Sequence, residues 1–354
     1  MNPRLVFKAA LVCLLLVLLA EGVLTLAKRH APFFRLFQNQ IVSCEILDDL
    51  AACSLKSGRP LIVVMGDSVV YGSDLHAHGV PHWREQALAA GLQRQLPQAT
   101  VLDLSLDGAL PGDYLGLYAA ARRLKPDWII FEYNYRMFSQ KFGSPSEAVS
   151  RPWLRGLMSQ PLFPALPQTA GDKIKSVLRK VSQLYRYAEA FRDAFFFPSR
   201  EEVINRLLAQ VLPSRSLRDP GDREMLLKLK IKPHYYTPLL TPEHAGLQAV
   251  QLLENELRRD QQPHLAFFTP QNQEYITEIA DPHTWPRNLA ILDSILGSLA
   301  DQKRFFYWNW GALYPADAFY DHCHLVPRYN ETFAKMLAGI IADGGRRDHV
   351  QRLE

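Results

Sequence analysis

Cysteine is scarce in this chain of 354 residues, with four in total and no two spaced as a C-x-x-C pair. A structural zinc site is therefore not expected, because such sites use closely spaced cysteine and histidine ligands. Histidines at 76, 78 and 82 lack a cysteine or carboxylate pattern around them, so we expect no metal and no other cofactor. Cys44 and Cys53 are close in sequence, and both a disulfide and two free thiols are open.

A strong charge of one sign is also missing. Lysine and arginine total 40 against 36 aspartate and glutamate, which gives a formal net charge of +4 at pH 7. There is no basic arm or RNA-binding signature, so no nucleic-acid partner is expected. Between residues 136 and 245, however, 18 basic residues stand against 10 acidic ones. This excess fits either a solvated helix face or a surface for anionic lipid headgroups or an anionic polymer.

Long hydrophobic runs are missing everywhere except near the N-terminus. The run AALVCLLLVLLAEGVLTLA has basic residues on both sides and is about as long as the roughly 20 residues of a membrane helix. We expect residues 1–30 to be an uncleaved anchor that crosses the membrane through residues 5–27. A cleaved signal peptide is the alternative. We favour the N-terminus inside and the rest of the chain outside the cytoplasmic membrane.

Short hydrophobic runs, each followed by a loop, are typical of the buried strands of a parallel sheet. They lie at residues 60–65, 100–106, 127–133, 264–270 and 304–310. Helical patterns alternate with them at residues 82–96, 112–125, 284–302 and 327–343. This alternation predicts an α/β fold with about five parallel strands between layers of helices.

The long gap between the third and fourth runs predicts a mainly helical insertion at about 140–245. Within it, residues 172–196 have apolar side chains at helical spacing opposite a basic face. We therefore divide the chain into four parts. They are an anchor at 1–30, a linker at 31–57, one α/β domain at 58–345 that includes the insertion, and a tail at 346–354.

Two short motifs follow predicted strands at the edge of the sheet where parallel α/β proteins bind ligands. Gly-Asp-Ser directly follows the first run and makes Ser68 a candidate nucleophile. Asp321 and His324 lie between the last run and the last helix. A histidine can act as general base for the serine, and an aspartate can orient the imidazole. His322 lies between them and leaves the choice of base open.

These residues resemble the SGNH, or GDSL-type, hydrolase superfamily in four blocks that occur in order. The blocks are GDSVVYG, LSLDGALPGD, FEYNYR and DHCH. The resemblance implies a flavodoxin-like three-layer α/β/α fold in which Ser68, Asp321 and His324 are catalytic. It also implies an oxyanion hole formed by the backbone N–H groups of Ser68 and Gly108 and the side chain of Asn134. Gly112 is the alternative glycine.

The third block departs from the family pattern Gly-x-Asn-Asp, because Glu132 precedes and Tyr135 follows the central residues. Arg136 either pairs with Glu132 or points at substrate. We count it among the candidate substrate-binding residues. The others are Asp67, Gln271 and Asn272, of which the last two follow the fourth strand and have side chains suited to hydrogen bonding with a sugar.

The resemblance and the anchor together predict a serine esterase or O-acyltransferase at the periplasmic side of a bacterial inner membrane. Similar envelope proteins act beside a membrane-bound O-acyltransferase, which would be a partner here. The expected substrate is an acylated cell-surface glycan, with acetyl groups favoured. A lipase or lysophospholipase is one alternative. A non-catalytic protein that binds a glycan or the acyltransferase is another.

Overall fold

The computed structural model describes residues 3–28, 44–54, 58–80, 82–155, 157, 170–191, 239–301 and 303–344. The chain divides into two compact units. The first unit comprises Met1–Gly58 and Leu166–Glu201, and the second comprises Arg59–Ala165 and Glu202–Glu354. The predicted insertion is therefore divided between the two units.

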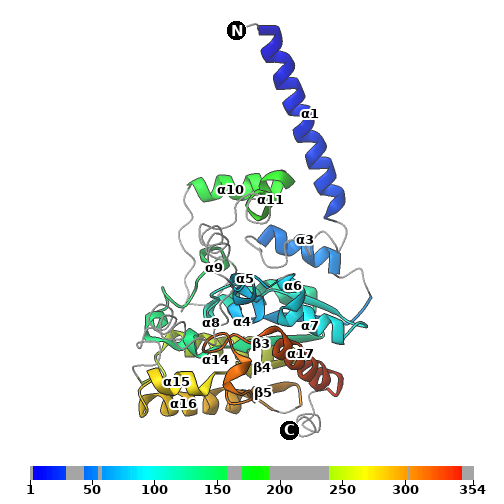
Figure 1. Cartoon of the computed structure of the whole chain (residues 1–354). Helices are drawn as coiled ribbons and strands as arrows, with labels where there is room; N and C mark the ends of the chain where they lie inside the picture. Colours follow the sequence, from blue (N-terminus) through cyan, green and yellow to red (C-terminus); the bar gives the residue numbers. More distant parts are fainter. Residues whose placement is uncertain are drawn as a thin grey trace, which may run out of the picture. The chain divides into compact units, whose positions relative to one another are not determined.

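The second unit contains a five-stranded, all-parallel sheet (Figure 1). Its strands are β1 (Leu61–Met65), β2 (Thr100–Asp103), β3 (Trp128–Tyr133), β4 (His264–Phe268) and β5 (Phe305–Asn309). The strand order is β2-β1-β3-β4-β5, so the chain reverses its direction of travel across the sheet at β1. The carboxyl end of β1 is thus the topological switch point, where open α/β sheets bind their ligands.

Helices cover both faces of this sheet, which confirms the predicted α/β class. They are α4 (Ser68–Tyr71), α5 (Ser73–Ala77), α6 (Trp83–Gln86), α7 (Leu88–Gln95), α8 (Pro111–Ala121), α9 (Pro152–Arg155), α14 (Ala245–Arg259), α15 (Gln273–Ile279), α16 (Thr284–Leu299) and α17 (Pro327–Ala342). Short 3₁₀ turns occur at Arg122–Leu124, Tyr135–Phe138, Gln140–Phe142 and Ala316–Ala318. Because both faces are covered, every residue of β1 and β4 is buried, as their continuous apolar runs require.

The alternation of side chains along β3 shows the two layers. Ile130 belongs to the core cluster that also contains residues of α7 and α17, and these two helices pack against each other. The next residue, Phe131, points to the opposite face, where its ring lies 6.0 Å from that of Tyr114 in α8. Helix α8 packs in turn on α14. The sheet is therefore the middle of three layers.

Three differences between the predicted and the observed elements have a local cause. The strand at 100–106 ends at Asp103, although the following loop stays beside β1 because the N–H of Leu104 donates to the carbonyl of Val64. The helix at 82–96 is broken at Ala87, which has extended backbone. The helix at 172–196 is interrupted at Ser182, whose hydroxyl accepts a hydrogen bond from the N–H of Tyr185 and so caps a new helix.

The first unit contains α1 (Pro3–Ala27), α3 (Cys44–Ser54), α10 (Ala170–Val181) and α11 (Gln183–Phe191). In α1, residues Val6–Ala27 form a 22-residue stretch with a mean hydropathy of 2.6, long and apolar enough to cross a membrane. Helix α3 lies within the segment predicted as a linker. The tail predicted at 346–354 lies outside the described residues.

Cys44 and Cys53, for which both a disulfide and two free thiols were left open, belong to α3. Their side chains lie outside the described residues, so the expectation stays untested.

Candidate active site

Ser68 lies at the start of α4, directly beyond the carboxyl end of β1. The carboxylate of Asp67 accepts a hydrogen bond from the N–H of Val69 at 2.9 Å and caps this short helix. Gly66 lets the chain turn tightly from strand to helix, since a Cβ atom there would lie 2.3 Å from Cγ2 of Val70. The glycine and the aspartate of the Gly-Asp-Ser motif therefore each have a structural role, and together they hold the turn that presents Ser68.

His324 and Asp321 lie in the loop between β5 and α17, as expected. The imidazole Nε2 of His324 is 2.9 Å from the hydroxyl oxygen of Ser68, across 256 residues of sequence. Its Nδ1 is 2.9 Å from both carboxylate oxygens of Asp321. The same carboxylate accepts hydrogen bonds from the backbone N–H groups of Cys323 and His324, each at 3.0 Å. The loop thus holds Asp321 within hydrogen-bonding distance of His324, and His324 within hydrogen-bonding distance of Ser68.

A second carboxylate, which the sequence interpretation did not single out, contacts the same histidine. Oδ2 of Asp74 lies 2.5 Å from Nδ1 of His324. Asp74 reaches this position because α4 ends at Gly72 in the left-handed conformation, with φ of 81°, and α5 begins at the next residue. No motif in the sequence marks Asp74, because its role depends on this reversal between two short helices.

The electrostatics of the cluster follow from its two carboxylates. Burial disfavours the charged imidazolium, but the negative charges of Asp321 and Asp74 outweigh burial and raise the pKa of His324 well above its usual range. Burial alone would raise the pKa of Asp321, but His324 and His322 hold it well below the usual range. The resting site therefore favours a charged pair of imidazolium and carboxylate.

Asn134 lies at the carboxyl end of β3, next to the histidine loop. Its carbonyl oxygen accepts a hydrogen bond from the N–H of Arg136 at 3.1 Å, and its amide nitrogen donates to Sγ of Cys323 at 3.2 Å. Cys323 is in turn next to His324 in the chain. The side-chain amide is thus fixed in direction beside the base, as an oxyanion donor requires. Its role as a donor stays a prediction.

The two candidate glycines are glycine for different reasons. Gly108 adopts a backbone conformation that favours glycine, and Gly112 lies too close to a neighbouring segment for a side chain. Gly108 has a φ of 69° and open space where a Cβ would lie. Its loop lies beside the serine turn, since the N–H of Leu106 donates to the carbonyl of Gly66 at 3.0 Å. Gly112 lies in α8, where a Cβ would be 2.4 Å from the carbonyl oxygen of Ala148. The role of Gly108 as an oxyanion donor, with Gly112 as the alternative, stays a prediction.

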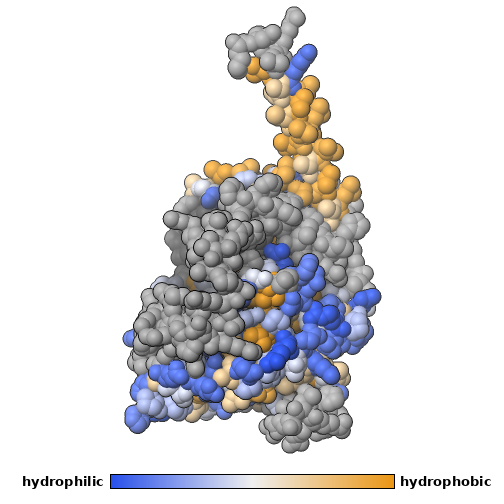
Figure 2. Space-filling view, viewed as in Figure 1, coloured by the Kyte–Doolittle hydropathy of each residue, from blue (hydrophilic) through white to orange (hydrophobic). Residues whose placement is uncertain are grey.

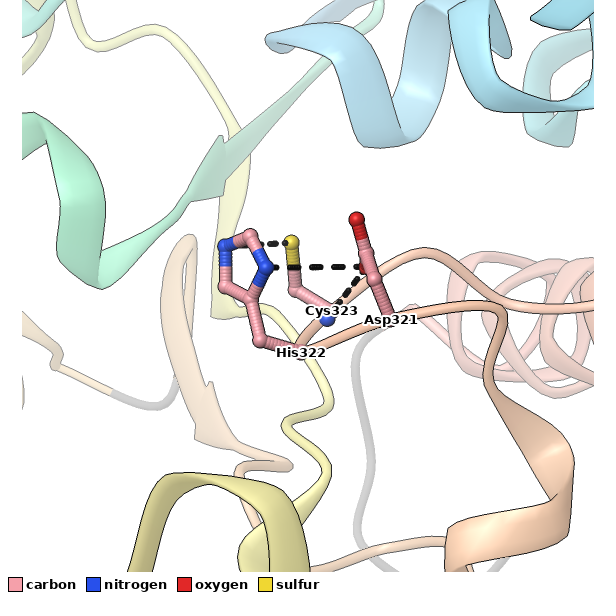
Figure 3. Close-up of side chains that lie close together, drawn as sticks. All are labelled: Asp321, His322 and Cys323. Carbon is pink, nitrogen blue, oxygen red and sulfur yellow. Dashed lines mark hydrogen bonds and ion pairs between the residues drawn. The ribbon is translucent and has the colours of Figure 1, made fainter. Parts of the chain in front are cut away.

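His322, the competing base, contacts a different partner (Figure 3). Its Nε2 lies 3.3 Å from Sγ of Cys323, and its Nδ1 lies 3.6 Å from Oδ1 of Asp321. Burial would raise the pKa of the Cys323 thiol, but the neighbouring histidines lower it. Cys323 is fully buried.

Two groups of side chains in this region are of metal-ligating types. Asp321, His322 and Cys323 form one group, and Asp74, Asp321 and His324 form the other, with ligand atoms within 4.8 Å of one another. Both groups include Asp321, whose two oxygens already contact His324. An imidazolium between two carboxylates accounts for the second group without a metal.

The arrangement around Arg136 differs from the expected pair with Glu132. Arg136 forms an ion pair with Asp67 at 3.3 Å, and the Asp67 side chain is fully buried. Glu132 instead accepts hydrogen bonds from the N–H of Asp67 at 2.9 Å and from the hydroxyl of Thr269. Burial and the nearby charge of Asp67 raise the pKa of Glu132 well above its usual range. Asp67 thus supports the turn that presents Ser68, and the positive charge of Arg136 balances the negative charge of the Asp67 carboxylate.

Gln271 and Asn272 lie after β4, at the predicted edge, but their side chains face inward. Gln271 is fully buried and donates to the carbonyl of Thr269 at 3.3 Å. Asn272 caps α15 through the N–H of Tyr275 and donates to the carbonyl of Asp321 at 3.4 Å. Asn272 supports the histidine loop, since its backbone N–H also donates to the carbonyl of His322 at 2.8 Å. Their predicted binding of substrate stays a prediction.

No protein-family model matches this chain, and no curated protein matches it. Among solved structures, the chain is similar to one from Agrobacterium tumefaciens described as "a putative arylesterase". The identity is 14% and the TM-score is 0.35, over 80% of this chain and 99% of that one.

Proposed function

We propose that this chain is a serine esterase or O-acyltransferase that works through an acyl-enzyme on Ser68. The observation that carries the proposal is the hydrogen-bonded line from Ser68 through His324 to Asp321, with both distances at 2.9 Å. A serine is a weak nucleophile unless a base lies within hydrogen-bond reach and a third group orients that base. A base and an orienting group both lie in these positions at the carboxyl edge of the sheet, which supports the proposal.

In the proposed reaction, Oγ of Ser68 attacks the carbonyl carbon of an ester while Nε2 of His324 takes its proton. The oxyanion of the tetrahedral intermediate is stabilised by the N–H groups of Ser68 and Gly108 and by the amide of Asn134. Collapse of the intermediate breaks the ester C–O bond, and His324 returns the proton to the leaving alkoxide. Water or a sugar hydroxyl then attacks acyl-Ser68, with His324 again acting as the base.

We further propose that α1 anchors the protein in a bacterial inner membrane, with the site on the periplasmic side. The apolar length of α1 and the resemblance to envelope members of the SGNH superfamily support this placement. The substrate we favour is an acetylated cell-surface glycan, and a membrane-bound O-acyltransferase is the partner that would supply the acyl group. A lipase or lysophospholipase uses the same chemistry on longer acyl chains. The non-catalytic alternative does not account for the aligned triad.

The test uses the full chain purified in detergent as wild type and Ser68→Ala. The matched control is Ser73→Ala, which alters a nearby serine that donates to Asp107 and does not contact His324 in the triad. We expect wild type and Ser73→Ala to hydrolyse p-nitrophenyl acetate and Ser68→Ala to lose at least a thousandfold in rate. Equal rates in wild type and Ser68→Ala would reject the acyl-serine mechanism.

Two further measurements assign the substrate class. A series of p-nitrophenyl esters with longer chains separates an acetyl-specific enzyme from a lipase. Mass spectrometry of oligosaccharides added to the reaction detects acetylated products, which identify a transferase. A preference for acyl chains of eight or more carbons would replace the glycan proposal with the lipase alternative.

A further inference from the structure

The apolar side chains of helix α10 are exposed. Ile174, Val177, Leu178 and Val181 are 61%, 58%, 39% and 72% exposed, and Figure 2 shows a hydrophobic surface over this helix. The polar residues Ser176 and Arg179 of the same helix are less exposed. A surface helix in water has the opposite orientation, with its apolar stripe toward the core. The exposed face of α10 therefore suits an apolar medium.

The exposed residues form one continuous stripe with a basic border. They are spaced i, i+3, i+4 and i+7, so they lie on one side of the helix. Lys173 and Lys175 lie one residue before and after Ile174, about 100° to either side of it, and both are exposed. An apolar stripe between lysines is typical of a helix that lies in the plane of a membrane surface.

A carboxylate of α1 attaches this region to the apolar helix. Glu21 accepts hydrogen bonds from the N–H groups of Gln183 at 2.7 Å and Leu184 at 3.2 Å, and from the hydroxyl of Ser182. These donors form the beginning of α11, which has no earlier helical turn to satisfy them. Glu21 therefore caps α11, and it fixes the break between α10 and α11 against α1.

A second set of polar contacts, centred on Asp49, joins α3 to α11 and to the residue that follows α1. Asp49 of α3 forms ion pairs with Arg186 of α11 at 2.5 Å and with Lys28, just after α1, at 2.9 Å. Arg186 also donates to the carbonyl of Arg179 at 2.8 Å, near the end of α10. The four helices that the structure describes in the first unit are thus connected at the C-terminal end of α1.

The position of Glu21 along α1 sets the level of α10 and α11. Glu21 lies six residues before Ala27, which is about 9 Å along a helix. The apolar stretch Val6–Ala27 has 22 residues and is about 33 Å long, against about 30 Å for the hydrocarbon core. With the stretch centred on that core, Glu21 lies about 7 Å inside its boundary, a depth that interfacial helices reach and at which a carboxylate without partners is costly. The start of α11 supplies its partners at that level.

We propose that α10 and α11 form an interfacial hairpin that lies on the membrane beside α1. The apolar stripe of α10 enters the boundary between headgroups and acyl chains, and Lys173 and Lys175 contact anionic headgroups. The proposal rests on the proposed membrane anchoring by α1. Its occupant is the lipid bilayer, because the stripe is exposed, its border is cationic and Glu21 ties the start of α11 to the apolar helix α1.

The test places a photoreactive benzophenone amino acid at single positions of the full chain, reconstituted in phosphatidylcholine vesicles with one third phosphatidylglycerol. Val177 probes the stripe, Ser176 is the matched neighbour on the other side of α10, and Leu16 probes α1. We expect lipid adducts by mass spectrometry from Val177 and Leu16, at least tenfold above Ser176. In the Val177 probe chain, Lys173→Gln with Lys175→Gln reduces the adducts to phosphatidylglycerol at least threefold.

The outcomes separate the hairpin from the anchor. Lipid adducts from Leu16 without adducts from Val177 would overturn the hairpin and leave the anchor intact. Adducts from neither position would reject the anchor and the hairpin with it. Cross-links from Val177 to a second copy of the chain instead of lipid would make the stripe a protein interface and overturn the proposal.

Discussion

Asp74 and His324 are joined by a contact of 2.5 Å between a carboxylate oxygen and the imidazole Nδ1. The same nitrogen lies 2.9 Å from Asp321. One proton on one nitrogen thus faces two carboxylates. The second carboxylate stabilises the imidazolium that forms when Ser68 is deprotonated, but it also keeps the histidine protonated at rest. The two effects have opposite consequences for the rate at neutral pH.

We expect Asp74→Asn to move the acidic limb of the pH–rate profile to lower pH, because one charge that raises the pKa of His324 is removed. Activity requires the neutral imidazole and is lost as pH falls through the pKa of His324, so a lower pKa extends activity toward acid. The measurement is kcat/KM for p-nitrophenyl acetate between pH 5 and 10. Asp317→Asn, an exposed acid paired with Arg328, is the control and leaves the limb in place. An unmoved limb in Asp74→Asn would show that Asp74 does not set this pKa.

Asp321→Asn is expected to act on the rate itself. Asp321 orients the ring and holds the loop through two backbone N–H groups, so its replacement lowers the plateau of kcat by about 10⁴-fold, as for other triads. Comparison of the plateau in Asp74→Asn and Asp321→Asn identifies the triad acid. A larger loss in Asp74→Asn would exchange the roles of the two carboxylates.

Cys323→Ala tests whether the buried thiol takes part in the chemistry. The neighbouring histidines lower the pKa of the thiol, yet the side chain is fully buried and its sulfur already accepts a hydrogen bond from the amide of Asn134. We expect ester hydrolysis within about tenfold of wild type, and a loss of about 1–2 kcal/mol in the free energy of unfolding from the small cavity and the lost acceptor. Initial rates and urea denaturation measure both. A rate as low as that of Ser68→Ala would make the thiol part of the reaction.

Glu132 is expected to make stability depend on pH. Burial raises its pKa in the folded state, so the folded chain binds the proton more tightly than the unfolded chain. Its contribution is fully present below the ordinary pKa of a glutamate and is lost as pH rises through the raised folded pKa. Glu132→Gln does not show this loss of stability. The Tm of the variant minus the Tm of wild type therefore increases as pH rises.

Glu132→Ala is the companion variant. It leaves the N–H of Asp67 and the hydroxyl of Thr269 without their buried acceptor, which costs about 2–3 kcal/mol. Thermal unfolding followed by circular dichroism from pH 5 to pH 9 measures all three proteins. A difference between Glu132→Gln and wild type that stays constant with pH would contradict the raised pKa.

The two glycines of the site differ in what an added methyl group meets. In Gly66→Ala the new Cβ lies 2.3 Å from the side chain of Val70 and 3.3 Å from Cβ of Glu132, so the serine turn must shift. We expect a cost of about 3 kcal/mol and a fall in kcat. Gly108→Ala meets open space and costs only about 1 kcal/mol, from its positive φ. Urea denaturation and hydrolysis rates check the order, and equal costs would contradict it.

The five strands were predictable because a sheet covered on both faces needs continuous apolar runs, and each run of this chain became a strand. The triad was predictable for a related reason. Ser68 and the Asp321–His324 pair each follow a strand, and the carboxyl ends of parallel strands meet at one edge of the sheet. The helix breaks at Ala87 and Ser182 were not predictable, because each depends on packing or capping by residues elsewhere.

The sequence by itself determined the sheet, the ends of its strands and the apolar length of α1, since these follow from short-range patterns of burial and turn residues. Only the tertiary structure decided what the side chains at those ends contact. It placed Asp74 on His324, turned Arg136 to Asp67, and gave α10 an outward apolar face held through Glu21. Such contacts depend on where loops return in space, and a single charged or polar residue has no periodicity that records its partner.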